Sequence, residues 1–284
     1  MSRTLLSIGH GYSARALARR LLPLGWTVIG TTRSEDKAKA LAGEGVGPLI
    51  WPGTPLPIDR ATHVLTSVSP DDDGDPVLQE AGEVLAAARH LEWVGYLSTI
   101  GVYGDRQGRW VDESSELLAT TDRGRARVTA EADWLALGLP VHVFRLAGIY
   151  GPGRGPFTKV RRGTARRIIK PGQVFSRIHV EDIAAVLHAS IDAPNPGAVY
   201  NVCDDEPAPP QDVIGHAAEL LGMPLPEAVP FDEAEMSEMA RSFYADSKRV
   251  RNDRIKDELG VALLYPDYRS GLAAVLEAEG AGSS

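Results

Sequence analysis

The sequence predicts an α/β protein built on a doubly wound parallel sheet, with a small C-terminal substrate-binding lobe. Short apolar segments rich in β-branched residues alternate with longer helical segments through the first 150 residues. This alternation is typical of βαβ units, which form a parallel sheet with helices on both faces. After residue 150 the pattern loosens and prolines become frequent. Right-handed crossovers then give a Rossmann-type sheet, whose ligands lie beyond the C-terminal ends of its strands.

The first 150 residues are expected to form the nucleotide-binding domain. Its predicted strands are 4–8, 27–31, 49–50, 63–67, 93–98 and 141–145, and its predicted helices are 12–22, 34–42, 76–90 and 124–137. Residues 151–284 are expected to form the smaller lobe. Within that part, a helix over 180–191 and a strand over 199–203 predict that segment 179–203 returns to the main sheet.

Composition limits the class of protein and its compartment. The chain has 284 residues with 43% hydrophobic and 24% charged, enough to bury a large core. Cys203 is the single cysteine and the seven histidines have no zinc-like spacing, so neither an intrachain disulfide nor a metal site is predicted. No apolar run approaches the ~20 residues of a membrane helix, and we expect a cytoplasmic protein. The net charge of -8 argues against nucleic-acid binding.

The most informative segment is a glycine-rich turn near the N-terminus. An apolar strand over 4–8 leads into Gly9-His10-Gly11-Tyr12-Ser13-Ala14, and an amphipathic helix follows at once. Gly9 permits the tight turn, Gly11 lets the backbone approach a pyrophosphate, and Ala14 lets the helix pack on the strand. The free amides at the helix start would face the anion. The turn therefore predicts a dinucleotide site that includes Gly9, Gly11, Tyr12, Ser13 and Ala14.

Residues after the second and fourth strands indicate which dinucleotide binds. Folds that prefer NAD carry an acidic residue after the second strand, where this chain has Thr32, Arg33 and Ser34. Arg33 can stack on adenine and pair with a 2′-phosphate, which favours NADP over NAD, although NAD remains possible. In the alternative interpretation, Arg33 faces solvent and Ser34 only caps the next helix. Ser67, after the fourth strand, is expected beside the dinucleotide.

Four further segments resemble the extended short-chain dehydrogenase/reductases, the group of nucleotide-sugar epimerases and dehydratases. They are Tyr-Leu-Ser-Thr-Ile-Gly-Val-Tyr-Gly at 96–104, Arg-Leu-Ala-Gly-Ile-Tyr-Gly-Pro-Gly at 145–153, Ile-His-Val-Glu-Asp-Ile-Ala at 178–184 and Tyr-Asn-Val at 200–202. The four segments occur in the family's order and cover most of the chain. The shorter GxGxxA form of the glycine turn is similar to that of atypical members.

The chain departs from this family at the catalytic pair. The resemblance implies a Tyr-x-x-x-Lys pair on the helix after the fifth strand, and aligning that helix puts Arg123 at the tyrosine and Arg127 at the lysine. Thr99 matches the family's catalytic Ser/Thr. Arginine cannot act as a general base because its pKa is above ~12 and it only donates hydrogen bonds. Arg127 could still hold the cofactor ribose or a phosphate.

Other side chains are candidates for the missing acid–base group. Tyr103 follows the fifth strand and is the preferred replacement, with a packed loop aromatic as the alternative. His179 begins a helix, where a structural hydrogen bond is the alternative to an acid–base or substrate-binding role. Tyr244 and Lys248 also have the Tyr-x-x-x-Lys spacing, but they lie far along the chain, and we interpret this spacing as chance.

The expected substrate is a small anionic molecule. Arg154 and the basic residues up to Lys170 follow the presumed cleft, and Arg177 precedes His179 by two residues. This cluster predicts binding of a phosphorylated or nucleotide-linked sugar, unless it is simply a solvated basic face. The leading function is thus an NADP-dependent epimerase, dehydratase or reductase, with Thr99, Tyr103 and Arg127 as its predicted catalytic residues. The alternative is a non-catalytic NADP(H) sensor, and apolar residues of helix 76–90 would allow a homodimer.

Overall fold

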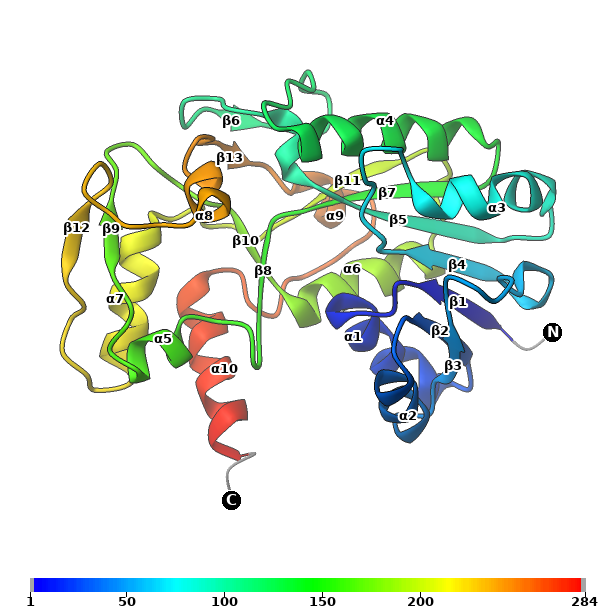
Figure 1. Cartoon of the computed structure of the whole chain (residues 1–284), viewed down its shortest axis with the longest axis horizontal. Helices are drawn as coiled ribbons and strands as arrows, with labels where there is room; N and C mark the ends of the chain where they lie inside the picture. Colours follow the sequence, from blue (N-terminus) through cyan, green and yellow to red (C-terminus); the bar gives the residue numbers. More distant parts are fainter. Residues whose placement is uncertain (1–2, 282–284) are drawn as a thin grey trace.

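The computed structural model describes residues 3–281, and its centre is a parallel sheet. Within this range the sheet has seven strands in the order β11-β7-β5-β4-β1-β2-β3, with every neighbouring pair parallel (Figure 1). The strands are β1 (Thr4–Ile8), β2 (Thr27–Thr32), β3 (Gly47–Ile50), β4 (His63–Thr66), β5 (Trp93–Thr99), β7 (Val141–Leu146) and β11 (Val199–Val202). The predicted doubly wound sheet is confirmed, and its strand order reverses between β1 and β4.

Helices cover both faces of this sheet. Helices α3 (Pro76–Ala87) and α4 (Asp122–Ala136) lie on one face, and α1 (Tyr12–Leu21), α2 (Glu35–Gly43) and α6 (Val180–Asp192) lie on the other (Figure 1). Each face has its own apolar core, centred on side chains such as Leu85 and Trp134 under the first layer and Leu17 and Ile183 under the second. Short 3₁₀ helices connect elements at Leu22–Leu24 (η1), Ile58–Arg60 (η2) and Ile100–Tyr103 (η3).

Local sequence signals set the ends of these helices. Asp75 caps α3 by accepting hydrogen bonds from the amides of Val77 and Leu78, at 2.9 and 3.2 Å. Pro76 then occupies the first turn, where its missing N–H costs nothing. At the other end Ala88 leaves helical geometry, so α3 ends at Ala87 and not at residue 90 as predicted.

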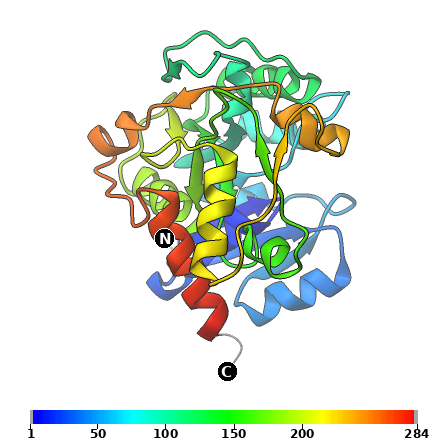
Figure 2. The same cartoon turned by 90° about the vertical axis from the view of Figure 1, so that its left-hand side faces the viewer.

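The remaining elements form a smaller lobe beyond the C-terminal ends of the strands. Its short strands pair as β8 (Gly148–Tyr150) with β10 (Arg177–His179), β9 (Arg167–Ile169) with β12 (Ala228–Pro230), and β6 (Trp110–Val111) with β13 (Arg249–Val250). Its helices are α5 (Phe157–Arg161), α7 (Pro210–Leu220), α8 (Glu238–Phe243) and α10 (Tyr268–Ala281), whereas α9 (Asp253–Asp257) packs against β11 of the main sheet. A third core lies between α5, α7 and α10, and α7 and α10 pack side by side (Figure 2).

Two connections join the lobe to the sheet. Segment 179–203 leaves the lobe, since α6 packs against α1 and β11 pairs with β7, with Val199 opposite Val143. In the other direction, β6 belongs to the first 150 residues but pairs with β13, with Trp110 opposite Arg249. The chain therefore crosses between the lobe and the sheet domain in both directions, through segment 179–203 and through the β6–β13 pair. None of the helices within residues 3–281 is long and apolar enough to span a membrane.

Candidate functional site

The glycine turn between β1 and α1 has a geometry that requires glycine at its first position. Gly9 has φ +76, a conformation that side-chain-bearing residues rarely adopt. A Cβ at Gly9 would also meet Val68 Cγ2 at 3.0 Å and Ser67 Oγ at 3.1 Å. The Gly9 amide donates to Thr31 Oγ1 at 2.7 Å, and the Ser67 hydroxyl donates to the Gly9 carbonyl. The structure thus brings Ser67 to the turn, where its side chain holds the Gly9 carbonyl, while its expected place beside a dinucleotide stays a prediction.

The start of α1 is open to a ligand. Gly11 is the N-cap, no side chain caps the helix, and its first turn has no acidic residue. By contrast, Ser34 caps α2 and Asp75 caps α3. A Cβ at Gly11 would meet only the Gly9 carbonyl oxygen, at 3.6 Å. Exposed, uncapped amides at the positive end of a helix fit an anionic group such as a pyrophosphate.

The other residues of the glycine turn pack around the exposed start of α1, which we call the dinucleotide cradle together with Gly9 and Gly11. Ser13 and Ala14 are buried, and Ala14 is 1% exposed where α1 packs on the sheet. The Tyr12 hydroxyl donates to the Pro152 carbonyl at 2.9 Å, and burial raises the pKa of Tyr12. The guanidinium of Arg154 lies 5.7 Å from the centroid of the Tyr12 ring. The loop after β8 therefore lies against the start of α1.

The residues after β2 are placed where a ribose group would be recognised. Arg33 is exposed and has no hydrogen bond or ion pair within the described part of the chain. The Ser34 hydroxyl accepts a hydrogen bond from the Lys37 amide at 3.4 Å, so Ser34 caps α2 as its alternative interpretation states. Thr32 Oγ1 accepts from the Ser34 amide at 3.4 Å. Arg33 is thus the group at this edge that remains available to a phosphate.

Arg123 and Arg127, which the sequence alignment puts at the positions of the expected pair, both lie on α4. Arg127 Nη1 donates to the Leu97 carbonyl at 2.6 Å and to the Tyr96 hydroxyl at 3.1 Å. Its Nη2 donates to Ser69 Oγ at 2.9 Å, in the loop after β4. Arg123, one helical turn earlier, is exposed, and its guanidinium lies 5.8 Å from the centroid of the Phe243 ring in α8. Arg127 therefore binds the C-terminal part of β5, whereas Arg123 faces the lobe.

Thr99 ends β5 close to this face. The half-buried Thr99 Oγ1 accepts a hydrogen bond from the Gly101 amide at 3.1 Å and caps η3. An accepting hydroxyl keeps its own proton, so Thr99 can still donate to a substrate oxygen. The Thr99 hydroxyl is thus fixed in position and retains one donor.

A buried ion pair beneath α4 was not predicted from the sequence. Arg145 of β7 donates to both carboxylate oxygens of Glu131 of α4, with Nη2 to Oε2 at 2.7 Å. The side chains are only 6% and 4% exposed. Ser98 Oγ donates to the same carboxylate at 2.5 Å. The available signal was a charged residue inside the otherwise apolar segment 141–146, because such a charge needs a buried partner.

Tyr103 belongs to this buried network and not to an open cleft. Its side chain is 0% exposed, its hydroxyl donates to Asn201 Oδ1 at 2.7 Å, and the hydroxyl accepts from Arg145 Nη1 at 2.9 Å. Burial raises the pKa of Tyr103 to about 12. Because the buried hydroxyl already donates one hydrogen bond and accepts another, the structure argues against the predicted acid–base role of Tyr103.

His179 also has a structural environment. It is 2% exposed and caps α6, with Nδ1 accepting from the Glu181 amide at 3.3 Å. Its ring centroid lies 4.1 Å from that of Tyr265. Burial lowers the pKa of His179 to about 4, so the ring is neutral at physiological pH. This geometry favours the structural hydrogen bond over a role in binding substrate.

Tyr244 and Lys248 do not share a helix face. Tyr244 is the C-cap of α8, and Lys248 lies beyond the helix, where its Nζ donates to the Gly104 carbonyl at 2.7 Å. The ammonium also pairs with Asp246 at 3.1 Å. The chance interpretation of this spacing agrees with their positions.

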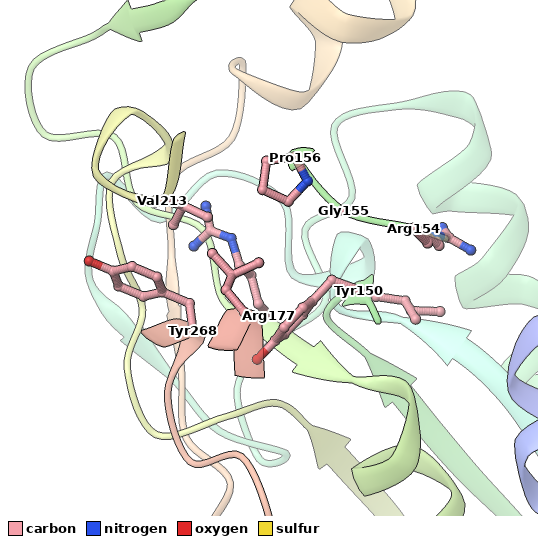
Figure 3. A pocket seen from close by; sticks show the side chains of 9 residues that line it. Tyr150, Arg154, Gly155, Pro156, Arg177, Val213 and Tyr268 are labelled. Atoms are coloured by element: carbon pink, nitrogen blue, oxygen red, sulfur yellow. The ribbon is translucent and has the colours of Figure 1, made fainter. Parts of the chain in front are cut away.

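The predicted basic stretch is used mainly for surface contacts. Arg161 pairs with Glu279 at 2.6 Å, and Arg166 pairs with Glu227 at 3.5 Å. Arg167 donates from Nε to the Pro226 carbonyl at 2.9 Å. Of the predicted substrate-binding residues, Arg154 and Arg177 instead line a cavity between the loop after β8, α7 and α10 (Figure 3).

Comparison with solved structures establishes the relationship. No protein-family model matches the chain. A functionally unknown conserved protein from Silicibacter pomeroyi DSS is 62% identical, with a TM-score of 0.95 over 98% of this chain and 99% of that chain. The chain belongs to the family of that protein. The predicted resemblance to the short-chain dehydrogenase/reductases agrees with the fold of the structures that follow, which have lower identity to this chain.

Two more distant structures share the fold of this family. One is dTDP-glucose 4,6-dehydratase from Bacillus anthracis str. Ames in complex with NAD, 16% identical with a TM-score of 0.78, covering 99% of this chain and 97% of that chain. The other is the human epimerase family protein SDR39U1 with NADPH, 18% identical with a TM-score of 0.71, covering 96% and 99%. The fold is therefore that of the NAD-dependent epimerases and dehydratases.

Two curated relatives are similar in sequence. Protein YeeZ of Escherichia coli (strain K12) is 28% identical over 279 residues, covering 92% of this chain and 95% of its own length. The 3-diazoavenalumate denitrifying reductase of a Streptomyces species is 29% identical over 179 residues, covering 57% of this chain and 55% of its own length. The second relative is thus matched over about half of either chain.

Proposed function

We propose that this protein is an NADP(H)-dependent reductase of the epimerase/dehydratase type that acts on a small anionic substrate. The observation that carries the proposal is the pair of arginines on α4, Arg123 and Arg127, at the positions of the family's tyrosine and lysine. Next to them, the glycine turn keeps the backbone geometry that a dinucleotide needs. The site therefore keeps its fit to a hydride carrier while it lacks the usual proton-transfer group.

Residues of this chain fit a bound nicotinamide dinucleotide. The open amides at the start of α1 and the bare Gly11 would hold the pyrophosphate, and Arg33 would bind a 2′-phosphate. Structures with the same fold contain NAD or NADPH, which supports this assignment. When bound, the dinucleotide supplies or accepts hydride.

The arginines fit reduction of a polar double bond with solvent as the proton source. A guanidinium that is always protonated cannot exchange the proton that a tyrosine exchanges in the resembled family. Hydride transfer to a polar double bond builds negative charge on the substrate, which the Arg123 guanidinium and the Thr99 hydroxyl would stabilise. Arg123 is exposed toward the lobe, and solvent can return the proton there. The Streptomyces relative named as a reductase supports the same direction.

The class of anionic substrate is also proposed, and two observations bear on it. The sequence predicts a phosphorylated or nucleotide-linked sugar, and the fold neighbours include a dTDP-glucose dehydratase. However, the basic residues behind that expectation are largely engaged at the surface, as with Arg161 and Glu279. What the site supports directly is one anionic group near Arg154 and Arg177.

The first test is a fluorescence titration with NADPH and NADH, followed by NADPH oxidation with a panel of aldehydes, ketones and sugar nucleotides. We expect NADPH to bind and at least one carbonyl compound to be reduced. Arg123→Met should leave NADPH affinity unchanged and lower kcat by about 10²–10³, the usual loss when an oxyanion donor is removed. Arg125→Met is the matched control, because Arg125 pairs with Asp122 on the exposed side of the same helix. If neither NADPH nor NADH binds, the proposal is overturned.

A non-catalytic NADP(H) sensor is the second candidate. The burial of Tyr103 favours it, because no tyrosine then replaces the missing phenol. Tight NADPH binding without turnover of any substrate, together with a partner whose affinity depends on the redox state of the cofactor, would support the sensor over the reductase.

A further inference from the structure

The smaller lobe contains a partly open cavity whose lining is mostly apolar and aromatic. Its volume is about 220 Å³, and the residues that line it include Tyr150, Arg154, Arg177, Val213 and Tyr268. Pockets for drug-sized ligands measure about 300–1,000 Å³, so this one suits a smaller molecule. Figure 3 shows the rings of Tyr150 and Tyr268 beside the Arg177 side chain, while Arg154 points away from them. The cavity therefore combines apolar walls with one central cation.

Arg177 is held rigidly, and part of its guanidinium is free. It lies in β10, opposite Gly148 of β8. Its Nη1 donates to the carbonyls of Phe175 at 2.9 Å and Ala208 at 3.1 Å. Its Nε and Nη2 have no hydrogen-bond partner within residues 3–281, and no carboxylate of that range lies within ion-pairing distance. A fixed guanidinium with two free neighbouring donors matches a planar oxyanion.

The acidic residue nearest in the fold does not neutralise this charge. The Asp204 amide donates to the Arg177 carbonyl at 2.7 Å, which places Asp204 directly beside β10. Asp204 is 1% exposed, and neither carboxyl oxygen has a hydrogen-bond partner in the described part of the chain. Burial raises the pKa of Asp204, although Arg177 opposes the shift. Neither carboxyl oxygen of Asp204 pairs with the Arg177 guanidinium in the described part of the chain, so the guanidinium remains available to a ligand.

The second cation of the cavity serves a different neighbour. The Arg154 guanidinium lies over the Tyr12 ring, at the start of α1. Arg177 therefore stands as the single cation directed at the cavity centre (Figure 3). A phosphate dianion or a diphosphate needs more than one positive charge or several backbone amides in such a buried place. One guanidinium balances a monoanion.

We propose that this cavity binds a compact organic acid, with its carboxylate on Nε and Nη2 of Arg177 and its apolar or aromatic body against Tyr150 and Tyr268. The proposal rests on the function proposed above in taking this acid as the substrate of the reductase. It replaces the nucleotide-linked sugar with a smaller, singly charged molecule. Strand β8 ends at Tyr150, and the loop after it contains Pro152 and Arg154, which contact Tyr12 at the start of α1, so the acid would lie on the side of the lobe that faces the glycine turn.

Calorimetric titrations of the intact protein saturated with NADPH test this proposal. Phenylacetate is the probe, phenylacetamide is its neutral counterpart, and phenyl phosphate and UDP-glucose represent the competing classes. We expect phenylacetate to bind at least ten-fold more tightly than the amide, because a charge-assisted bidentate contact is lost in the amide. Tighter binding of phenyl phosphate or UDP-glucose than of phenylacetate would overturn the proposal, as would equal affinity of the acid and the amide.

A variant pair locates the binding. Arg177→Met should lower phenylacetate affinity at least ten-fold, whereas Arg167→Met should not, because Arg167 donates to the Pro226 carbonyl outside the cavity. Unchanged affinity in Arg177→Met overturns the assignment. If Arg177→Met does not fold, the acid–amide comparison on the unmodified protein still decides. NADPH binding without phenylacetate binding rejects this proposal alone, and phenylacetate binding without NADPH binding rejects the reductase while keeping the acid site.

Discussion

The glycine turn and the face of α4 lie at the same end of the sheet, but they differ in what they have kept. At the turn, the positive φ of Gly9, the open approach to Gly11 and the uncapped start of α1 provide all that a pyrophosphate needs from the backbone. On α4, the two positions of the expected proton-transfer pair hold Arg123 and Arg127. One region thus has the backbone geometry that the predicted pyrophosphate site requires, whereas the other lacks the tyrosine and lysine that the resemblance implies.

This difference teaches that cofactor binding and proton transfer depend on separable features. The turn is specified by packing, because Gly9 fits between Val68 and Ser67 only without a side chain. Proton transfer depends on single side chains that folding does not require. Arg127 donates three hydrogen bonds, to Leu97 and Tyr96 of β5 and to Ser69 in the loop after β4. A fold can therefore keep its cofactor cradle and exchange its acid–base group.

The largest effect is expected at the buried pair that supports the α4 face. Arg145→Met should lower the free energy of unfolding by about 3–5 kcal/mol, because it leaves the Glu131 carboxylate buried without its partner. Arg15→Met at the exposed pair with Glu44 should cost no more than about 1 kcal/mol. Denaturant unfolding of both variants measures the contrast. Equal losses would mean that the α4 face does not rest on this ion pair.

Acid should unfold the protein through its buried neutral histidines. Burial lowers the pKa of His142 to about 4 from an ordinary value of 6.5, and its Nε2 accepts a hydrogen bond from the Asn195 amide at 2.9 Å. Above pH 6.5 neither state is protonated; below it the unfolded chain takes up the proton first, so stability falls until about pH 4. The shift corresponds to roughly 3 kcal/mol for this residue.

His142→Gln isolates that contribution, because an amide oxygen can accept the same bond without titrating. Unfolding free energies at neutral pH and near pH 4 should differ less in His142→Gln than in the unmodified protein. His10, within the glycine turn, has the same lowered pKa of about 4, so the turn and β7 should lose stability over the same acid range. An unchanged pH dependence in the variant would contradict this account.

The sequence was sufficient for the sheet and for the cofactor cradle. Apolar periodicity and glycine spacing are local signals, so the strands, α1 and the positions of Gly9 and Gly11 could be predicted within a few residues. The arginine at position 123 could likewise be found by aligning one helix. These features depend on neighbours in the chain, which a sequence displays directly.

Contacts between residues far apart in the chain could not be predicted from the sequence. Tyr103 looked available because it follows β5, yet Asn201 and Arg145, from distant strands, fill both roles of its hydroxyl. The basic stretch looked like one cluster, but Glu279 and Glu227 neutralise parts of it from other segments. The cavity at Arg177 also forms only when α7 and α10 pack against β8. Burial and pairing of such groups follow from tertiary packing, which spacing alone does not report.

The two glycines of the turn should separate folding from binding. Gly9→Ala forces alanine into a left-handed conformation, which costs roughly 1–2 kcal/mol, and it also crowds Val68. Gly11→Val should leave stability within about 0.5 kcal/mol, since the position is exposed and open, yet it should weaken NADPH binding by blocking the pyrophosphate. Thermal unfolding together with NADPH titration distinguishes the two. Retained affinity in Gly11→Val would remove the pyrophosphate from this turn.

The smallest effect is expected at Arg33, where the cofactor cradle chooses between two dinucleotides. Arg33→Ala should weaken NADPH binding about ten-fold, or ~1.4 kcal/mol, and leave NADH affinity unchanged, because only NADPH carries the 2′-phosphate. Lys39→Ala is the control: it removes the same charge from α2, where Lys39 is exposed and lies 3.9 Å from Asp36. If both variants lose NADPH equally, net charge and not a specific contact sets the preference. If neither does, the cradle takes both dinucleotides, and its likeness to the family extends only to the pyrophosphate.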